Sequence, residues 1–289
     1  MKELIVVSGK GGTGKTSLTA AFANLASRKV LCDADVDAAD LFLITEPKVQ
    51  ERHEFKSGHK AQIQPAPCTS CGLCRELCRF AAISEDFEVD PLVCEGCGVC
   101  VYFCPEHAIA FPESNCGEWY ASETRMGPMV HARLNIAEEN SGKLVTLVRK
   151  EARNLAERLQ LDMILTDGPP GIGCPVIAAI GGASAVLIVT EPTVSGKHDM
   201  DRVVELARHF NIPAVVCINK YDLNPEMADT ITEYARQKGC DVMGRIPFDP
   251  VFVQAMVQKK TVLEYDPGSA ASKAVQEIWE RVVEKLNGL

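Results

Sequence analysis

The chain has 289 residues, enough for one large α/β domain with a small insert, because domains usually contain roughly 100 to 200 residues. Its formal net charge of −9 is not offset by any dense basic tract, which disfavours general binding to nucleic acid or to an anionic membrane. The N-terminus lacks a signal-peptide pattern and no stretch resembles a membrane span, so we expect a cytoplasmic protein. In that reducing compartment, thirteen cysteines are expected to be ligands or free thiols rather than disulfides.

The first expected elements flank a glycine-rich loop. Residues 4–7 (LIVV) are typical of a buried strand, and residues 17–28 have the periodicity and alanine content of a helix. The loop between them fits G-x-x-x-x-G-K-[ST], in which backbone N–H groups close around phosphates at a helix N-terminus. Lys15 is expected to reach the β- and γ-phosphates and Thr16 to complete the shell of a magnesium ion. The expected nucleotide-binding residues of the loop are Gly9, Gly11, Gly12, Thr13, Gly14, Lys15, Thr16 and Ser17.

Eight cysteines form two runs with the same spacing, C-x2-C-x2-C-x3-C. The first run is Cys68, Cys71, Cys74 and Cys78, and the second is Cys94, Cys97, Cys100 and Cys104. This spacing is that of bacterial two-cluster ferredoxins, in which the fourth cysteine of each run binds the other cluster. One 4Fe-4S cluster would then take Cys68, Cys71, Cys74 and Cys104, and the second would take Cys94, Cys97, Cys100 and Cys78. Pro105 follows the second run as expected, whereas Arg79 stands where proline is usual in the first. Zinc sites are the competing interpretation, and a disulfide framework is less favoured still.

The cysteine runs interrupt an alternation of strands and helices. A second apolar strand precedes them near residues 29–33, and a periodic helix follows at 141–160. Further apolar strands are expected at 161–167, 185–190 and 214–219, separated by helical stretches. This alternation predicts an α/β fold with a doubly wound, mostly parallel sheet. We expect that domain at residues 1–60 and 115–289, with a small α+β ferredoxin-like domain inserted at 61–114.

The loop carries an additional lysine, Lys10, directly after its first glycine. With it the motif KGGTGKT resembles the deviant Walker A of the MinD/ParA and nitrogenase iron-protein superfamily. The resemblance implies a nucleotide-dependent homodimer in which Lys10 reaches the partner subunit's nucleotide. A cation supplied in this way would stabilise phosphate charge and couple hydrolysis to dimerisation.

Further segments continue the resemblance. CDADVDAADL resembles the family's switch I, where Asp33 and Asp35 would serve magnesium and the attacking water, with Asp40 where the family has asparagine. ILTDGPPG resembles Walker B and switch II, with Asp167 on magnesium and Gly171 responding to the γ-phosphate. The implied catalytic residues are Lys10, Lys15, Asp35 and Asp167, and the implied magnesium ligands are Thr16, Asp33 and Asp167.

The adenine base is expected to meet residues near the end of another strand. NKYD resembles the adenine-reading segment through Asn219, and IPFDP at 246–250 resembles the segment that packs beside the base. Asp222 also matches the guanine-reading N-K-x-D pattern, so GTP is the alternative to ATP.

Two other cysteines are candidates for an additional cluster. Cys174 lies seven residues after Asp167, a spacing that resembles the switch II cysteine of the nitrogenase iron protein, and Cys116 could be its companion. A small thiol that starts a buried helix is the simpler interpretation of Cys174.

Three functions follow from these motifs. The first is an ATPase whose dimer switching gates electron transfer from two 4Fe-4S clusters to a redox partner. The second is an ATP-dependent carrier that delivers an iron-sulfur or other metal cluster to an apo-protein. The third is spatial positioning in the manner of MinD or ParA. The last ranks lowest, because the C-terminal helix at 272–289 mixes acidic and basic residues on its polar face and suits packing on its own core.

Overall fold

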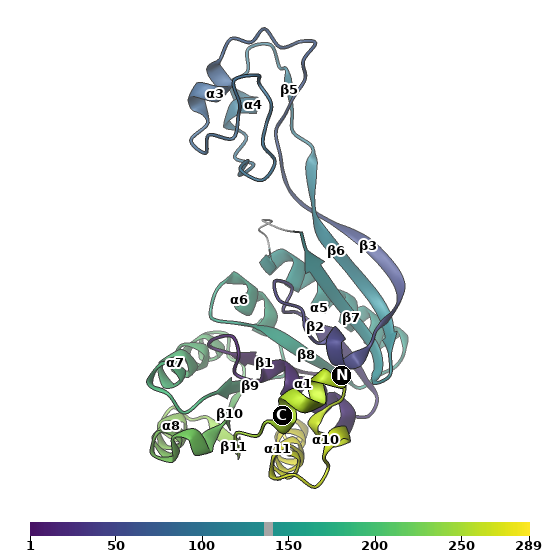
Figure 1. The fold of residues 1–289 in the computed structure, drawn as a ribbon, viewed down its shortest axis with the longest axis vertical. Coiled ribbons are helices and arrows are strands. Elements are labelled where there is room, and N and C mark those ends of the chain that lie inside the picture. The colour runs from purple at the N-terminus through teal and green to yellow at the C-terminus, as the bar shows by residue number, and fades with distance from the viewer. Residues whose placement is uncertain (136–140) are drawn as a thin grey trace. The chain divides into compact units, whose positions relative to one another are not determined.

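The computed structural model describes residues 1–135 and 141–289, which form a nine-stranded sheet, a separate two-stranded sheet and helices (Figure 1). The strand order of the large sheet is β11-β10-β9-β1-β8-β2-β7-β6-β3. Its strands are β1 (Lys2–Ser8), β2 (Lys29–Asp33), β3 (Lys48–His59), β6 (Glu113–Thr124), β7 (Gly127–Leu134), β8 (Met163–Pro170), β9 (Ala185–Thr190), β10 (Ala214–Asn219) and β11 (Asp241–Ile246).

The centre of this sheet is parallel. β1 pairs with β8 and β9, and the pairs β9–β10, β10–β11, β2–β8 and β2–β7 run in the same direction. Strands covered on both faces read as continuous apolar runs, and the four side chains from Leu4 to Val7 of β1 are fully buried. The expected α/β fold with a mostly parallel sheet is therefore confirmed.

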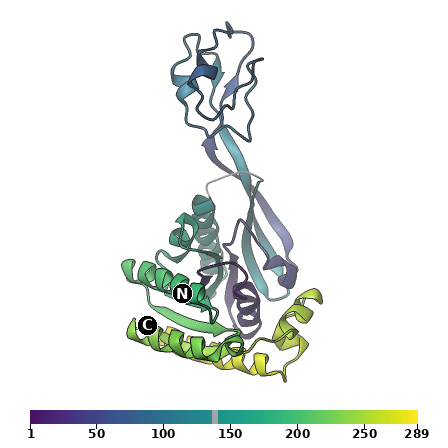
Figure 2. The same cartoon turned by 60° about the vertical axis from the view of Figure 1, so that its left-hand side comes forward.

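Helices cover both faces of the sheet (Figure 2). α1 and α11 pack against each other, and the ring centroids of Phe22 and Trp279 are 4.9 Å apart. α5 packs on β2 and α6. The helices of this layer arrangement are α1 (Lys15–Leu25), α5 (Ser141–Arg158), α6 (Cys174–Ile180), α7 (Val194–His209), α8 (Pro225–Gln237), α9 (Val251–Val257), α10 (Val262–Tyr265) and α11 (Ala270–Asn287).

The C-terminal helix α11 packs on the core of its own chain. Val275, Ile278, Val282 and Leu286 form its buried stripe, as the spacing of these residues predicts. Among the described residues, no helix combines the length and the apolar character needed to cross a bilayer.

The chain divides into two compact units. One contains most of the large sheet and comprises Met1–Arg52, Trp119–Arg133 and Ser141–Leu289; the other comprises His53–Glu118 and a short later segment that begins at Leu134. Two of the boundaries lie within the long strands β3 and β6, and a third lies at the end of β7, whereas the sequence predicted an insert at 61–114. The chain therefore passes between the units along continuous strands.

The second unit carries the cysteine runs. Its small sheet pairs β4 (Gln62–Ile63) with β5 (Ile109–Ala110) in an antiparallel manner. Two short helices, α3 (Leu73–Leu77) and α4 (Val99–Tyr102), each follow a glycine with positive φ, Gly72 and Gly98, and contact each other. The two-fold repetition in the sequence thus corresponds to two similar loop-helix segments.

Candidate functional site

The glycine-rich loop connects β1 to α1 and lines a large pocket. Gly12 and Gly14 have φ of 79° and 87°, a conformation that glycine adopts without strain. A Cβ on Gly14 would also lie 2.5 Å from Nδ2 of Asn219. The pocket encloses about 1260 Å³ of empty space including its open mouth. Its lining includes the loop and helix residues 11–18, Asp35, Asp40 and Asn219.

Lys15, the first residue of α1, lies among buried carboxylates. Its Nζ is 2.8 Å from Oδ2 of Asp35 and 3.8 Å from Oδ1 of Asp167. Burial lowers the pKa of Lys15, but the charges of Asp167 and Asp35 outweigh this effect and raise it above its ordinary value. Lys15 is therefore a fixed cation at the N-terminus of α1, where a phosphate would bind.

Thr16 and Asp167, both expected from the sequence to be magnesium ligands, are hydrogen-bonded to each other. The Thr16 hydroxyl donates to Oδ2 of Asp167 over 2.6 Å, and Thr19 donates to Oδ1 over 3.2 Å. Asp167 lies on β8 and is fully buried, because β8 is a central strand between β1 and β2. Burial raises the pKa of Asp167, and the charge of Lys15 opposes that rise.

Asp33 ends β2 beside Asp167, its partner in the β2–β8 register. Its carboxylate accepts from the backbone N–H groups of Asp35 and Leu41, each at 3.2 Å. Burial, with the charges of Asp167 and Asp35, raises the pKa of Asp33 well above its usual range. Three buried carboxylates surround Lys15, and a divalent cation would neutralise this excess of negative charge, so the residues fit a magnesium ion.

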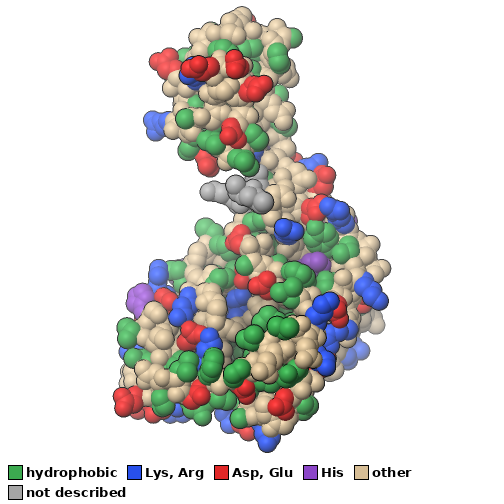
Figure 3. Space-filling model, viewed as in Figure 1, with side chains coloured by type: hydrophobic (Ala, Val, Ile, Leu, Met, Phe, Trp, Pro, Cys, Tyr) green, Lys and Arg blue, Asp and Glu red, His purple; other side chains and the backbone are tan. Residues whose placement is uncertain are grey.

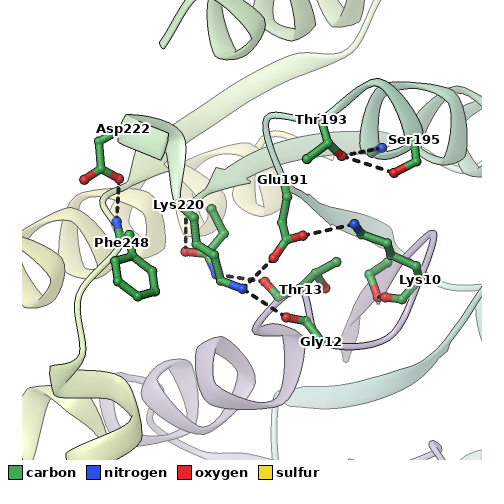
Figure 4. A network of polar contacts seen from close by, with 12 residues as sticks. Lys10, Gly12, Thr13, Glu191, Thr193, Ser195, Lys220, Asp222 and Phe248 are labelled. Carbon is green, nitrogen blue, oxygen red and sulfur yellow. Dashed lines mark hydrogen bonds and ion pairs between the residues drawn. The ribbon is translucent and has the colours of Figure 1, made fainter. Parts of the chain in front are cut away.

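Gly9 and Lys10 lie outside the lining of the pocket. A Cβ on Gly9 would lie 2.2 Å from Cβ of Asp199, so glycine allows β1 to approach α7 at this point. Lys10 forms an ion pair with Glu191 at 3.1 Å, and Glu191 also pairs with Lys220 at 2.5 Å (Figure 4). The Lys10 side chain keeps 37% of its surface exposed. The additional lysine is thus held within its own chain at the rim of the loop.

Residues after β10 and β11 form the wall where a base would lie. Asn219 donates from Nδ2 to the backbone oxygen of Thr13 over 2.8 Å, which fixes the loop. Asp222 accepts from the backbone N–H of Phe248 over 2.6 Å, as Figure 4 shows, and Phe248 lines the pocket. Asp222 is therefore engaged in holding a pocket segment, whereas a guanine-reading carboxylate would need to face the base.

Several pocket residues have no counterpart in the sequence expectations. Phe252, Val253 and Met256 of α9 line the pocket, and Lys220 lines it too while its Nζ lies 3.3 Å from the backbone oxygen of Gly12. An apolar sequence such as that of α9 predicts a helix packed in the core, so it did not indicate a pocket wall. Glu191 follows β9 directly, and a carboxylate at the end of a parallel strand was the available signal for it.

The first predicted set of cluster ligands surrounds one cavity. Cys68, Cys71, Cys74 and Cys104 all line it, together with apolar side chains that include Ile63, Leu73, Phe87 and Ile109. Residues from both runs therefore meet, as the crossed ligand pattern requires. The Sγ of Cys104 accepts from the N–H of Ala108 at 3.3 Å, and that of Cys68 from Ser70 at 3.4 Å.

The second set repeats part of this arrangement. The Sγ of Cys78 accepts from the N–H of Ala82 at 3.4 Å, four residues later, as Cys104 does from Ala108. Cys94, Cys97 and Cys100 are partly or largely exposed, and none of the thirteen cysteines, all of which lie in the described residues, forms a disulfide. Within residues 1–135 and 141–289, no group of three or more His, Cys, Asp or Glu side chains is arranged to hold a metal ion.

The other cysteines differ in their surroundings. Cys116 is buried and its thiol lies 2.8 Å from the backbone oxygen of Ser57, while Cys174 is exposed at the start of α6. Cys32, Cys217 and Cys240 are buried, and burial raises the pKa of each thiol. Cys116 and Cys174 belong to different units.

Charged side chains of both signs are interspersed over the face of the molecule that Figure 3 shows. This distribution agrees with the mixed charge of the sequence, in which acidic residues outnumber basic ones by 39 to 30.

A glycine-rich loop between strand and helix, a buried lysine and the Thr16–Asp167 pair define a P-loop nucleotide-binding protein. The family model described as the CobQ/CobB/MinD/ParA nucleotide binding domain matches residues 4–262. The chain therefore belongs to this family, whose MinD and ParA members are P-loop ATPases.

Two relatives and two solved structures illustrate the range of similar proteins. An uncharacterized protein of Methanocaldococcus jannaschii is 31% identical over 98% of this chain and 96% of its own length. Nitrogenase iron protein 2 of Methanothermococcus thermolithotrophicus is 23% identical over 51% of this chain and 53% of its own length. The septum site-determining protein MinD of Pyrococcus horikoshii, complexed with Mg-ADP, aligns at a TM-score of 0.59 and 18% identity, covering 99% and 97% of the two chains. The MinC:MinD cell division complex of Aquifex aeolicus aligns at 0.60 and 19%, covering 98% and 96%.

Proposed function

We propose that the protein is an ATP-hydrolysing switch with a deviant Walker A loop that carries two 4Fe-4S clusters in its second unit. Nucleotide-dependent dimerisation would gate electron transfer from these clusters to a redox partner. The comparisons favour a MinD/ParA-type ATPase more strongly than they favour electron transfer. The cysteine unit is the feature that supports the redox part of the proposal.

The observation that carries this part is the meeting of Cys68, Cys71, Cys74 and Cys104 around one cavity. A cuboidal cluster separates its four thiolate ligands further than a single ion does, so a cavity among four thiols suits a cluster better than zinc. Backbone N–H groups directed at the sulfurs of Cys68, Cys78 and Cys104 would stabilise the thiolate form. Bound clusters would supply one-electron redox chemistry.

The nucleotide site supports hydrolysis through charges that the chain already holds in place. The γ-phosphate of ATP would compete with Asp35 for Lys15, since both are anionic partners of the same ammonium group. Asp35, released from this ion pair, could orient the attacking water. Thr16 and Asp167, with Asp33 behind them, would hold magnesium, which neutralises charge on the phosphates.

The deviant lysine is part of the same proposal. Lys10 is tethered to Glu191 in its own chain and its side chain is partly exposed, so it can exchange this partner for the phosphates of a second subunit. That exchange would make hydrolysis depend on the dimer.

Cysteine variants test the cluster assignment. Anaerobically purified protein should contain about eight irons and eight sulfides per chain. Cys104→Ala and Cys78→Ala should each reduce this content to about four, because each removes one ligand from a different cluster. Cys240→Ala, which changes a buried cysteine outside both runs, should leave the content unchanged. Stoichiometric zinc in place of iron, or iron unaffected by both ligand variants, would exclude the proposed clusters.

A further inference from the structure

The short helix α2 (Phe42–Thr45) begins at the nucleotide site. The backbone N–H of Leu41, directly before the helix, donates to Oδ2 of the buried Asp33 over 3.2 Å. The N–H groups of Ile44 and Thr45 in turn donate to the backbone oxygen of Leu41. If the Asp33 carboxylate changed its hydrogen-bond partners, the position of Leu41 and of the first turn of α2 would therefore change as well.

Two of the strands that cross between the units, β3 and β6, are tied to α2. β3 begins at Lys48, and only two residues separate it from Thr45, so α2 leads into it directly. β6 ends at Thr124, and Nε of the next residue, Arg125, donates to the backbone oxygen of Ile44 over 3.0 Å. Two of the unit boundaries lie within these strands, after residues 52 and 118.

Arg125 also contacts the segment that follows α9, a helix that lines the nucleotide pocket. Its Nη2 donates to the backbone oxygen of Lys259 over 2.9 Å and to Oε2 of Glu264 over 3.0 Å, and its Nη1 pairs with Oε1 of Glu264. Lys259 follows α9, whose Val253 and Met256 line the pocket. One guanidinium group thus joins β6 to α2 and to the α9–α10 segment.

The side chains around this node fix its geometry. Glu264 accepts from the N–H and the hydroxyl of Thr261 as part of a capping box at the start of α10, so its carboxylate is already oriented toward Arg125. The guanidinium group of Arg125 presents several N–H donors in fixed directions, and these reach the carboxylate of Glu264 and two backbone oxygens at once. The ammonium group of a lysine at this position could not make all of these contacts. The neighbouring Glu46–Lys259 ion pair is exposed and is expected to add little.

We propose that Arg125 is the positioning residue that couples the nucleotide state to the cysteine unit through α2 and β6. Rearrangement of Asp33 and Leu41 when ATP and magnesium bind would move α2, and Arg125 would pass the movement to β6 while β3 receives it through the chain. This role of the coupling rests on the proposed function, because the movement would control the proposed iron-sulfur clusters. The coupling itself concerns only the nucleotide pocket and the two strands.

Hydrogen exchange of the full-length, anaerobically purified protein tests this proposal. Saturating ATP–Mg²⁺, or a non-hydrolysable ATP analogue with Mg²⁺, should change deuterium uptake in peptides that cover α2, β3 and β6. In Arg125→Ala the change in β6 should fall by about fivefold or more, a coupling of ordinary allosteric size. Arg125→Lys should restore only part of it, because lysine cannot make all the contacts.

Arg245→Ala is the matched control. Arg245 has the same exposed fraction as Arg125, 30%, and pairs with Asp229, but it lies on β11 at the opposite edge of the sheet. This variant should keep the full response. The proposal is overturned if β3 and β6 of the unaltered protein do not respond to nucleotide, or if Arg125→Ala responds fully. Iron analysis of the same samples separates this outcome from failure of the proposed function, since protein without clusters could still show the coupling.

Discussion

Nζ of Lys15 lies 2.8 Å from Oδ2 of Asp35, so the lysine proposed to bind phosphate is neutralised by a carboxylate of the segment expected to respond to nucleotide. Both side chains are more than nine-tenths buried, which strengthens their interaction relative to a surface pair. In the proposed function, binding of a phosphate by Lys15 would therefore require Lys15 to exchange Asp35 for the phosphate.

The first prediction follows from this pair. Asp35→Asn should keep or increase the affinity for ATP, because Lys15 loses a competing charge, while hydrolysis should slow by about 100-fold as the water loses its orienting base. Isothermal titration and single-turnover kinetics measure the two effects separately. Asp37→Asn, at a largely exposed position in the same segment, is the control and should change neither. Unchanged hydrolysis in Asp35→Asn would remove Asp35 from the catalytic residues.

The second prediction concerns Lys10. Lys10→Ala should leave ATP binding to the single chain almost unchanged, because Lys10 does not line the pocket. Hydrolysis should fall on the order of 10³-fold if the lysine stabilises phosphate charge across a dimer. Sedimentation with a non-hydrolysable ATP analogue should show loss of the dimer.

Glu191→Gln provides the opposite change at the same ion pair. It weakens the tether of Lys10, so we expect more dimer at a given nucleotide concentration. Lys260→Ala, which removes an exposed lysine outside the pocket lining, is the control for both variants. A Lys10→Ala protein that hydrolyses ATP at the normal rate would exclude the role in trans.

The third prediction concerns the nucleotide base. Asp222→Ala should weaken ATP binding by about fivefold, since the N–H of Phe248 loses its acceptor and the pocket wall loosens. The preference for ATP over GTP should remain the same. A selective loss of GTP binding would instead identify Asp222 as a guanine reader. Asp229→Ala removes an exposed carboxylate on α8 and is the control.

The fourth prediction is a pH dependence of stability. Burial lowers the pKa of His131 to about 4. The unfolded chain, with an ordinary histidine pKa near 6.5, binds a proton between these values that the folded chain does not. The stability associated with neutral His131 is thus complete above about pH 6.5 and declines as the pH falls toward 4, by up to about 3 kcal/mol.

Denaturant unfolding of the unaltered protein and of His131→Gln at several pH values measures this effect. Their difference in free energy of unfolding should decrease between pH 7 and pH 5. His209→Gln, an exposed position on α7, is the control and should show no such trend. A pH-independent difference for His131→Gln would contradict the assignment.

Sequence reasoning succeeded where the signals are local. The phosphate-loop motif spans the eight residues from Gly9 to Thr16, from the end of a strand to the first turn of a helix, so its spacing alone places it. The parallel sheet followed from apolar runs buried on both faces.

Contacts between distant residues could not be predicted in the same way. The Lys10–Glu191 ion pair joins residues that are 181 positions apart in the sequence. The ends of the insert lie within two twelve-residue strands, β3 and β6, whose sequences do not change in character at the boundary. The role of Asp222 was ambiguous because an N-K-x-D pattern does not reveal which groups its carboxylate meets. Only the fold brings Phe248 to it.

The measurement that tests the central claim most directly is the reduction of the clusters with and without ATP–Mg²⁺. Anaerobic protein would be titrated electrochemically and followed by electron paramagnetic resonance, and electron transfer to an acceptor would be timed in parallel. We predict that ATP–Mg²⁺ shifts the cluster potential or the transfer rate, and that Lys15→Ala abolishes the shift. Clusters whose potential and transfer rate are the same with and without nucleotide would contradict nucleotide-gated electron transfer. ATP-dependent delivery of iron to an apo-protein would then identify the chain as a cluster carrier.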